Sequence, residues 1–170
     1  MATHPELRNL NTIASIDVES YNLAAELSDP KPRNVLASKF SIPFAIATTL
    51  YHQSSDVLSF TETARQSETI QNLASKVQVT ENKDMTAKLP DLRPATVKIK
   101  MADGASLETG VETNRGDWQD PYPEKDLRDK FISLVSRIYT AKDAANVFGQ
   151  LMMLEKHNLN DLLAALRKKD

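Results

Sequence analysis

The sequence contains no cysteine, and this absence excludes several kinds of chemistry at once. Disulfide bonds, thiolate nucleophiles and cysteine-ligated metal sites all require a residue that the chain does not have. Glycine is also scarce, with 4 residues in 170, and no glycine-rich phosphate-binding loop is present. The sequence therefore carries no signature of thiol chemistry or of nucleotide binding.

Neither sign of charge dominates, and long apolar runs are missing as well. The 21 Lys and Arg residues nearly balance 23 Asp and Glu residues, which gives no reason to expect nucleic acid or an anionic membrane as a partner. No run approaches the roughly 20 apolar residues of a membrane-spanning helix, and the N-terminus has no signal or transit pattern. We therefore expect a cytoplasmic protein.

The most apolar stretch of the chain runs from Lys39 to Ala47 and carries its own helix-start signal. Ser41 is suited to cap a helix that begins at Ile42, and Pro43 falls in the first turn, where its missing N–H costs nothing. Apolar residues cover more than one side of the following turns, as in helices buried on all sides. The pattern predicts a central core helix that ends near His52.

Alternating apolar and polar residues predict strands around this helix. The expected strands are 13–21, 76–80, 96–101 and 107–111, with a type I′ turn at Asp103-Gly104 between the last two. Helices are expected from Thr61 and from Ser67, a strand stub or loop anchor at 57–60, and a loop at 81–94. The resulting fold class is α+β, a two-layer sandwich of a four-stranded, mainly antiparallel sheet with helices on one face.

The character of the chain changes after Asn114, which predicts a division into 1–114 and 115–170. A proline-rich loop is followed by three helical patterns, with start signals at Pro123, Thr140 and Asn158. Each pattern carries an apolar stripe. The tail therefore either folds back on the first part or needs another subunit or domain to cover it.

The residues themselves do not reveal an active site. His4, His52 and His157 are far apart without ligand spacing, so no metal site is predicted. Asp17 and Glu19 alternate with apolar residues, which is typical of a solvated strand face. Taken alone, the pattern establishes an α+β domain with a helical tail.

A resemblance adds to this interpretation. The run Lys39-Phe40-Ser41-Ile42-Pro43-Phe44-Ala45-Ile46-Ala47 is similar to a signature of the C-terminal part of the MmgE/PrpD family. The Asp103-Gly104 hairpin, the segment 116–121 and the segment 127–131 follow in the same order as in that family. With the strand at 13–18 before them and the leucine-rich tail after them, these pieces cover nearly the whole chain.

The resemblance implies a fold, a reaction and a division of labour. Family members are longer lyases, such as 2-methylcitrate dehydratases and cis-aconitate decarboxylases, which act on tri- and dicarboxylates without a cofactor. Residues 1–114 resemble their α+β lid, and 115–170 resemble a linker and the last helices, which pack on a large helical domain. The catalytic Asp, His and Lys residues of the family lie mainly in that large domain, so no catalytic residue is assigned here.

The site residues that the resemblance implies are substrate-binding ones, Lys39, Ser41 and Phe44. Lys39 and Ser41 lie at the positively polarised start of the central helix, which suits a substrate carboxylate. Surface charge for Lys39 and simple helix capping for Ser41 are the alternative explanation, and the residues alone favour it over contact with a substrate. Phe44 stands where many members have a tyrosine, and a phenylalanine cannot donate that hydrogen bond.

Two hypotheses from different classes follow. In the first, the chain is the C-terminal portion of an MmgE/PrpD lyase, with dehydration the favoured reaction, and does not turn over substrate alone. In the second, it is a non-catalytic module that forms homo-oligomers or docks on a partner. A small-molecule-binding regulatory domain is a third reading, based on fold analogy alone.

Overall fold

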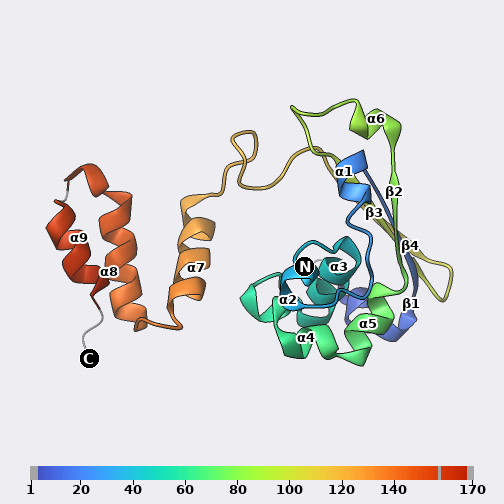
Figure 1. Cartoon of the computed structure of the whole chain (residues 1–170), viewed down its shortest axis with the longest axis horizontal. Helices are drawn as coiled ribbons and strands as arrows, with labels where there is room; N and C mark the ends of the chain where they lie inside the picture. The colour runs from blue at the N-terminus through green and yellow to red at the C-terminus, as the bar shows by residue number, and fades with distance from the viewer. Residues whose placement is uncertain (1–3, 157, 168–170) are drawn as a thin grey trace. The chain divides into compact units, whose positions relative to one another are not determined.

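A computed structural model describes residues 4–156 and 158–167 of the chain (Figure 1). Its internal contacts separate two compact units, residues 1–114 and residues 115–170. The two units are described in turn below.

The first unit is built on a four-stranded sheet. Its strands are β1 (Ile13–Ser20), β2 (Val77–Glu81), β3 (Ala95–Met101) and β4 (Ser106–Val111). Their order across the sheet is β2-β1-β3-β4. β1 pairs parallel with β2 and antiparallel with β3, and β3 pairs antiparallel with β4. The predicted α+β class with a mainly antiparallel sheet is confirmed.

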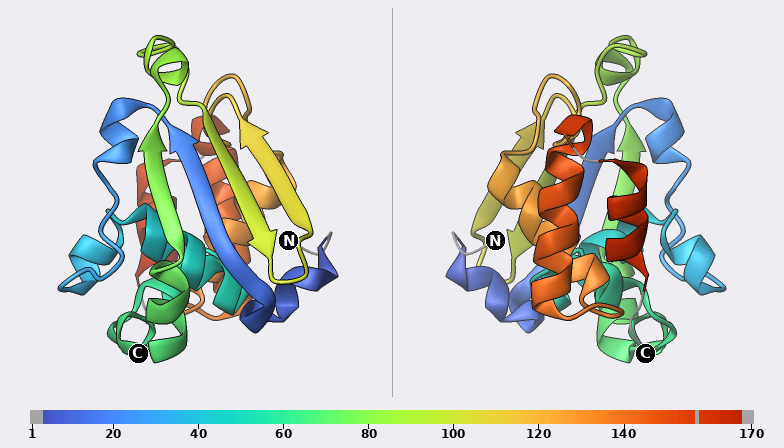
Figure 2. Two further views of the ribbon diagram at one scale, coloured as in Figure 1. Left: turned by 90° about the vertical axis from the view of Figure 1, so that its right-hand side faces the viewer. Right: turned by 90° about the vertical axis from the view of Figure 1, so that its left-hand side faces the viewer.

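Short helices connect β1 to its parallel neighbour β2. They are α1 (Asn22–Ala25), α2 (Val35–Ser38), α3 (Ile42–His52), η3 (Val57–Phe60), α4 (Glu62–Gln66) and α5 (Glu68–Ala74). Two 3-10 turns, η1 (Pro5–Arg8) and η2 (Leu10–Thr12), precede β1. The predicted central helix is confirmed as α3, which lies against one face of the sheet (Figure 2).

The core of this unit lies between α3, α5 and the sheet. Alternation in β1 sends Ile16 and Val18 toward the helices, where both are buried. They meet Phe44 and Ala47 of α3 and other buried side chains, namely Leu50, Ala64, Ile70, Leu73, Ala74, Ile99 and Met101. The opposite face of the sheet carries polar side chains.

Three local expectations differ from the structure. The hairpin is not type I′, because Gly104 has a positive φ of 91° and Asp103 does not. Met101 N–H donates to Ala105 O at 2.8 Å, which closes a three-residue loop with its left-handed residue last. The predicted loop 81–94 contains a helical turn, α6 (Lys83–Thr86), because Asn82 Oδ1 accepts from the N–H of Asp84. Residues 57–60 form a 3-10 turn, η3, so of the two alternatives the strand stub is wrong and the loop anchor remains.

The second unit contains three helices, α7 (Glu124–Val135), α8 (Ala141–Met152) and α9 (Leu159–Leu166), with a 3-10 turn η4 (Leu154–Lys156) before α9. The expected caps are present on two of them: Thr140 Oγ1 accepts from Asp143 N–H, and Asn158 Oδ1 accepts from Asp161 N–H. Phe131 and Phe148 pack with ring centroids 5.5 Å apart.

The loop before α7 is fixed to that helix around Gly116. Gly116 has a φ of +103°, and its N–H donates to Asp120 O at 2.7 Å. The Tyr122 ring packs against its Cα, with the Arg115 guanidinium 5.5 Å and the Lys130 ammonium 5.2 Å from the ring centroid. Arg115 also forms an ion pair with Asp126 of α7.

We expect Gly116→Ala to destabilise the second unit by about 2 kcal/mol. A left-handed backbone costs a non-glycine residue about 1–2 kcal/mol, and the new Cβ would lie 2.6 Å from Tyr122 Cε2. Gly104→Ala is the matched control, because Gly104 has a φ of +91° but no atom within 4 Å of the new Cβ. Thermal unfolding by circular dichroism measures both. Equal effects of the two changes would contradict the role of the Tyr122 contact.

Candidate functional site

The sequence-derived site residues lie at the start of α3, but their environments differ. Lys39 is exposed on the turn that follows α2. Ser41 is 2% exposed and is the N-cap of α3. Its Oγ accepts from Phe44 N–H at 3.0 Å and donates to the carbonyl of Asp29. The hydroxyl therefore joins the loop after α1 to the first turn of α3.

The backbone donors of this first turn are already engaged. Ile42 N–H donates to Leu27 O at 2.8 Å, and Ala45 N–H donates to Ser41 O at 2.9 Å. Pro43 has no N–H, and Phe44 N–H is bound by Ser41. Anion binding at a helix start uses free N–H groups, and the chain itself occupies them here. A carboxylate at this end of α3 would rely on side-chain cations.

Phe44 belongs to the core of the first unit. Its side chain has no exposed surface, and its ring lies 6.0 Å from that of Phe60, centroid to centroid. From this position it acts through packing, since no part of the ring reaches solvent.

Three positively charged side chains in the segment before α3 have no hydrogen-bond or ion-pair partner among the residues that the structure describes. Lys31, Arg33 and Lys39 are exposed, and their charged groups make no hydrogen bond or ion pair with any residue that the structure describes. The sequence has no acidic residue between Asp29 and Asp56. This segment, called the basic approach below, is therefore suited to bind anions. Sequence reasoning singled out Lys39 but not Lys31 or Arg33, although the gap in acidic residues was visible.

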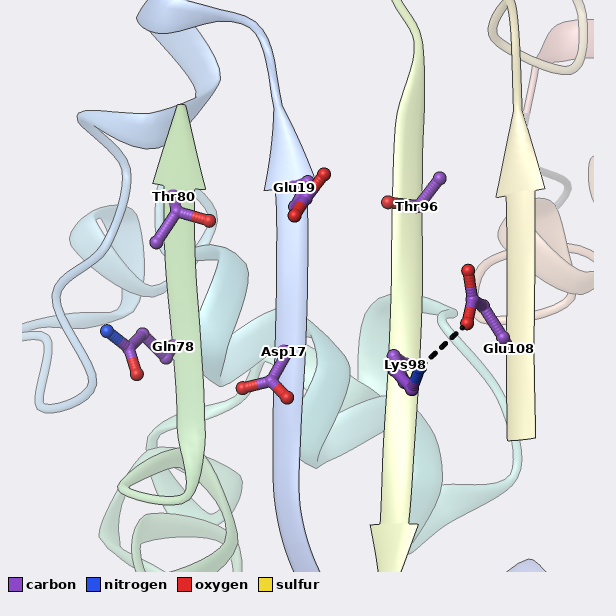
Figure 3. Close-up of a pocket in the computed structure, with 7 residues that line it drawn as sticks. All are labelled: Asp17, Glu19, Gln78, Thr80, Thr96, Lys98 and Glu108. Atoms are coloured by element: carbon purple, nitrogen blue, oxygen red, sulfur yellow. Dashed lines mark ion pairs between the residues drawn. The ribbon is translucent and has the colours of Figure 1, made fainter. Parts of the chain in front are cut away.

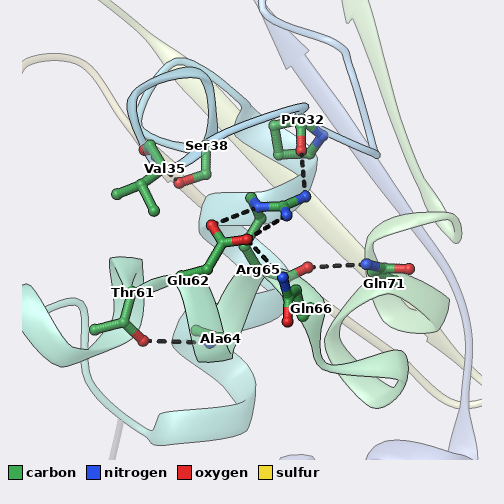
Figure 4. Close-up of polar contacts among 9 residues, drawn as sticks. All are labelled: Pro32, Val35, Ser38, Thr61, Glu62, Ala64, Arg65, Gln66 and Gln71. Atoms are coloured by element: carbon green, nitrogen blue, oxygen red, sulfur yellow. Dashed lines mark hydrogen bonds and ion pairs between the residues drawn. The ribbon is translucent and has the colours of Figure 1, made fainter.

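Arg65 lies near the same segment but is fully engaged (Figure 4). Its Nε donates to Glu62 Oε2 at 2.9 Å, and its Nη1 donates to Pro32 O at 3.3 Å. Hydrogen bonds from Arg65 lower the pKa of the Glu62 carboxyl, and Glu62 raises the pKa of Arg65. This arginine ties α4 to the loop before α2, so it is a structural tether rather than an anion ligand.

The face of the sheet that the helices leave open holds a shallow depression of about 370 Å³ (Figure 3). It is lined by Asp17, Glu19, Gln78, Thr80, Thr96, Lys98 and Glu108. Its charges are largely paired, with Lys98 Nζ 3.2 Å from Glu108 and Lys100 Nζ 2.8 Å from Asp17. Asp17 and Glu19 therefore lie on a solvated face, as the alternation of β1 predicts.

A comparison with protein-family models shows to which family the chain belongs. Residues 1–151 match the model of the MmgE/PrpD C-terminal domain. The chain belongs to the MmgE/PrpD family. No curated protein matches it. The match ends in α8, so the family domain includes the basic approach, the sheet and α7, while α9 lies beyond it.

This MmgE/PrpD domain buries hydroxyls but no ionisable side chain among the residues described. Its buried polar residues are Ser20, Ser38, Ser41, Thr48 and Ser59. No group of three or more His, Asp or Glu side chains able to hold a metal occurs in residues 4–156 and 158–167. His4 and His52 are exposed, and His157 lies outside the described residues. Within the same ranges, no helix is long and apolar enough to cross a membrane.

Proposed function

We propose that this chain is the C-terminal portion of an MmgE/PrpD lyase that acts on a citrate-like tri- or dicarboxylate, with dehydration as its reaction, and that it does not turn over substrate alone. The observation that carries the proposal is the family match over residues 1–151. The matched model is that of the C-terminal domain of the family. The side chains that the structure describes fit a supporting role in catalysis.

The described residues include no buried base, which supports the proposal that the chain does not turn over substrate alone. Dehydration of such an acid removes a proton next to a carboxylate, and hydroxide leaves as water. A base for this step works best when burial or a neighbouring charge brings its pKa near neutrality. The buried polar side chains described here are all hydroxyls. We therefore assign the base and the acid to a separate helical domain.

The positive charge of the basic approach supports the proposal that the substrate is a carboxylate. Lys39 is the member that the family signature includes, and its ammonium is exposed and unpaired among the described residues. We assign it contact with a substrate carboxylate, with Lys31 and Arg33 raising the local anion concentration. Ser41 and Phe44 then serve the site indirectly, because they fix the start of α3 from inside the fold.

The apolar surface of the second unit supports a helical partner domain. Within the family-matched part of this unit, several large apolar side chains are exposed, including Leu127, Leu134 and Ile138. Exposed apolar side chains in such number are typical of an interaction surface. We assign this surface to packing against the large helical domain.

A second candidate is a non-catalytic module that oligomerises or docks on a partner. One observation favours it: the first unit has a hydrophobic core of its own, and its central helix α3 is capped by Ser41 from the same unit. Such a unit folds without further domains. The two candidates differ in whether the chain restores a lyase when a helical domain is supplied.

The purified chain is expected to convert neither 2-methylcitrate nor cis-aconitate at a measurable rate, since it lacks a buried base among its described residues. Ultraviolet absorbance of the unsaturated acid and proton NMR of the mixture measure turnover. Turnover by the chain alone would contradict the division of labour. Addition of an MmgE/PrpD helical domain as a separate polypeptide is expected to produce lyase activity that depends on this chain. If the mixture of the two polypeptides has no activity, the result favours the second candidate, a non-catalytic module.

A further inference from the structure

The backbone of the basic approach is shaped at both ends by bonds between residues close in the chain. Before it, Asp29 Oδ1 accepts from the N–H of Lys31 at 2.9 Å, and the Asp29 carbonyl accepts from Ser41 Oγ. Further along, Asn34 Oδ1 accepts from the N–H of Ala37 at 2.8 Å and caps α2. The middle of the segment is attached by a contact of a different kind.

That contact comes from Arg65 of α4, 33 residues further along the chain (Figure 4). Its Nη1 donates to the carbonyl of Pro32 at 3.3 Å, and Pro32 is buried. Lys31 and Arg33, two of the three unpaired cations, are the direct neighbours of this proline. The backbone that carries both cations is therefore tied to α4 at one point.

Arg65 is itself held in one orientation on its other side. Its Nε donates to Glu62 Oε2 at 2.9 Å, and its Nη2 forms an ion pair with Glu62 Oε1. Gln66 Nε2 donates to Glu62 Oε1 at 2.7 Å, and Gln71 Nε2 of α5 donates to the Arg65 carbonyl at 2.9 Å. A two-pronged pair of this kind fixes the plane of the guanidinium. The Arg65 side chain is only 18% exposed, so it can act as a firm support.

We propose that Arg65 is a positioning residue for anion binding: held by Glu62, it fixes the backbone at Pro32 and so keeps Lys31 and Arg33 in the arrangement that receives a carboxylate. This inference rests on the proposed function, which assigns the basic approach to a carboxylate substrate. Arg65 does not itself bind the anion, because its Nε, Nη1 and Nη2 are engaged within the fold.

The chain between the tether and the cations is stiff enough to pass the position on. Pro30 and Pro32 flank Lys31, and a proline ring fixes its own backbone φ angle. Cations that are already ordered bind an anion more tightly than mobile ones, because less conformational entropy is lost on binding. Release of Pro32 from Arg65 should therefore weaken anion binding even though every cation is still present.

Citrate binding to the full chain, followed by two-dimensional ¹⁵N–¹H NMR at low salt, tests the site first. Low salt is needed because dissolved ions screen exposed charges. In the unmodified chain we expect citrate to shift the amide signals of Lys31, Arg33 and Lys39. If these signals do not move, the basic approach is not a carboxylate site, and both that part of the proposed function and this inference are overturned.

Glu62→Ala then separates positioning from charge, because the two effects have opposite signs. Loss of a nearby carboxylate would by charge alone strengthen citrate binding. Loss of the support for Arg65 should weaken it, and we expect the dissociation constant to rise by about two- to tenfold. Glu62 is 50% exposed and alanine is a good helix former, so we expect the variant to fold, which circular dichroism checks. Glu62→Gln, which keeps the side-chain shape and one acceptor, should act in the same direction by a smaller factor.

Glu68→Ala is the matched control. Glu68 is the first residue of α5, as Glu62 is of α4, and it is exposed without a hydrogen bond or ion pair to any residue that the structure describes. It removes the same charge but no tether, so the dissociation constant should stay the same or fall by about twofold or less. A rise with the Glu62 variants alone supports the proposal. An unchanged or lower dissociation constant in Glu62→Ala, or an equal rise in Glu68→Ala, overturns the positioning role and leaves the carboxylate site in place.

Discussion

Replacing Phe44 with alanine is expected to lower the free energy of unfolding of the first unit by about 3–5 kcal/mol. The ring has no exposed surface, so its removal leaves a cavity between α3, Phe60 and the sheet. Because small domains have only about 5–15 kcal/mol of stability in total, a loss of this size removes a large share of the free energy of unfolding. Urea denaturation followed by far-ultraviolet circular dichroism measures it.

Phe40→Ala is the matched control for this prediction. Phe40 is a phenylalanine in the same family signature, but it is 60% exposed, so we expect a change within about 0.5 kcal/mol. If the two variants were equally stable, Phe44 would not lie in the core. If Phe40→Ala instead abolished the activity of a reconstituted lyase while leaving stability unchanged, it would mark the exposed part of the signature as a contact surface.

The local structure of α3 follows from the sequence because every signal in it is short-range. A serine, a first-turn proline and an apolar run specify a capped, buried helix, and the structure has that helix from Ile42 to His52. The strands follow for the same reason, since alternation along β1 and β3 directly encodes which face is buried.

The short helices could not be predicted in the same way. α1, α2 and α6 each span 4 residues, too few for an apolar period to be recognised. They depend on caps and tertiary contacts, as where the side chain of Asn34 accepts from Ala37 N–H. The predicted type I′ turn at Asp103-Gly104 was wrong, because the length of the loop, and not the Asp-Gly pair alone, decides which turn closes a hairpin.

The candidate site was predictable only in part, because its character depends on contacts between distant residues. Ser41 was predicted as a cap, but its second bond, to the Asp29 carbonyl, joins residues 12 apart. Whether a cation is available also depends on the fold. Arg65 is tethered to Glu62 and Pro32, whereas Lys39 has no such partner among the described residues. Sequence alone does not distinguish these two.

Replacing Ser41 with alanine is the second large effect that we expect, about 2–4 kcal/mol of lost stability. Loss of the N-cap bond to Phe44 N–H costs about 0.5–2 kcal/mol, and a partly buried acceptor left without its donor, here the Asp29 carbonyl, adds about 1–3 kcal/mol. Here the change frees both Phe44 N–H, which is buried, and the carbonyl of Asp29. Urea denaturation of the chain measures the loss.

Lys39→Ala separates the structural role of this turn from its proposed role in binding. Lys39 is exposed and its ammonium has no partner among the described residues, so we expect a stability within about 0.5 kcal/mol of the original chain. In a reconstituted lyase the same change should raise KM, because a carboxylate loses a cationic ligand. Ser41→Ala should act on both properties through the position of α3. If Lys39→Ala left KM unchanged, the basic approach would not be the carboxylate site, whereas the capping role of Ser41 would remain.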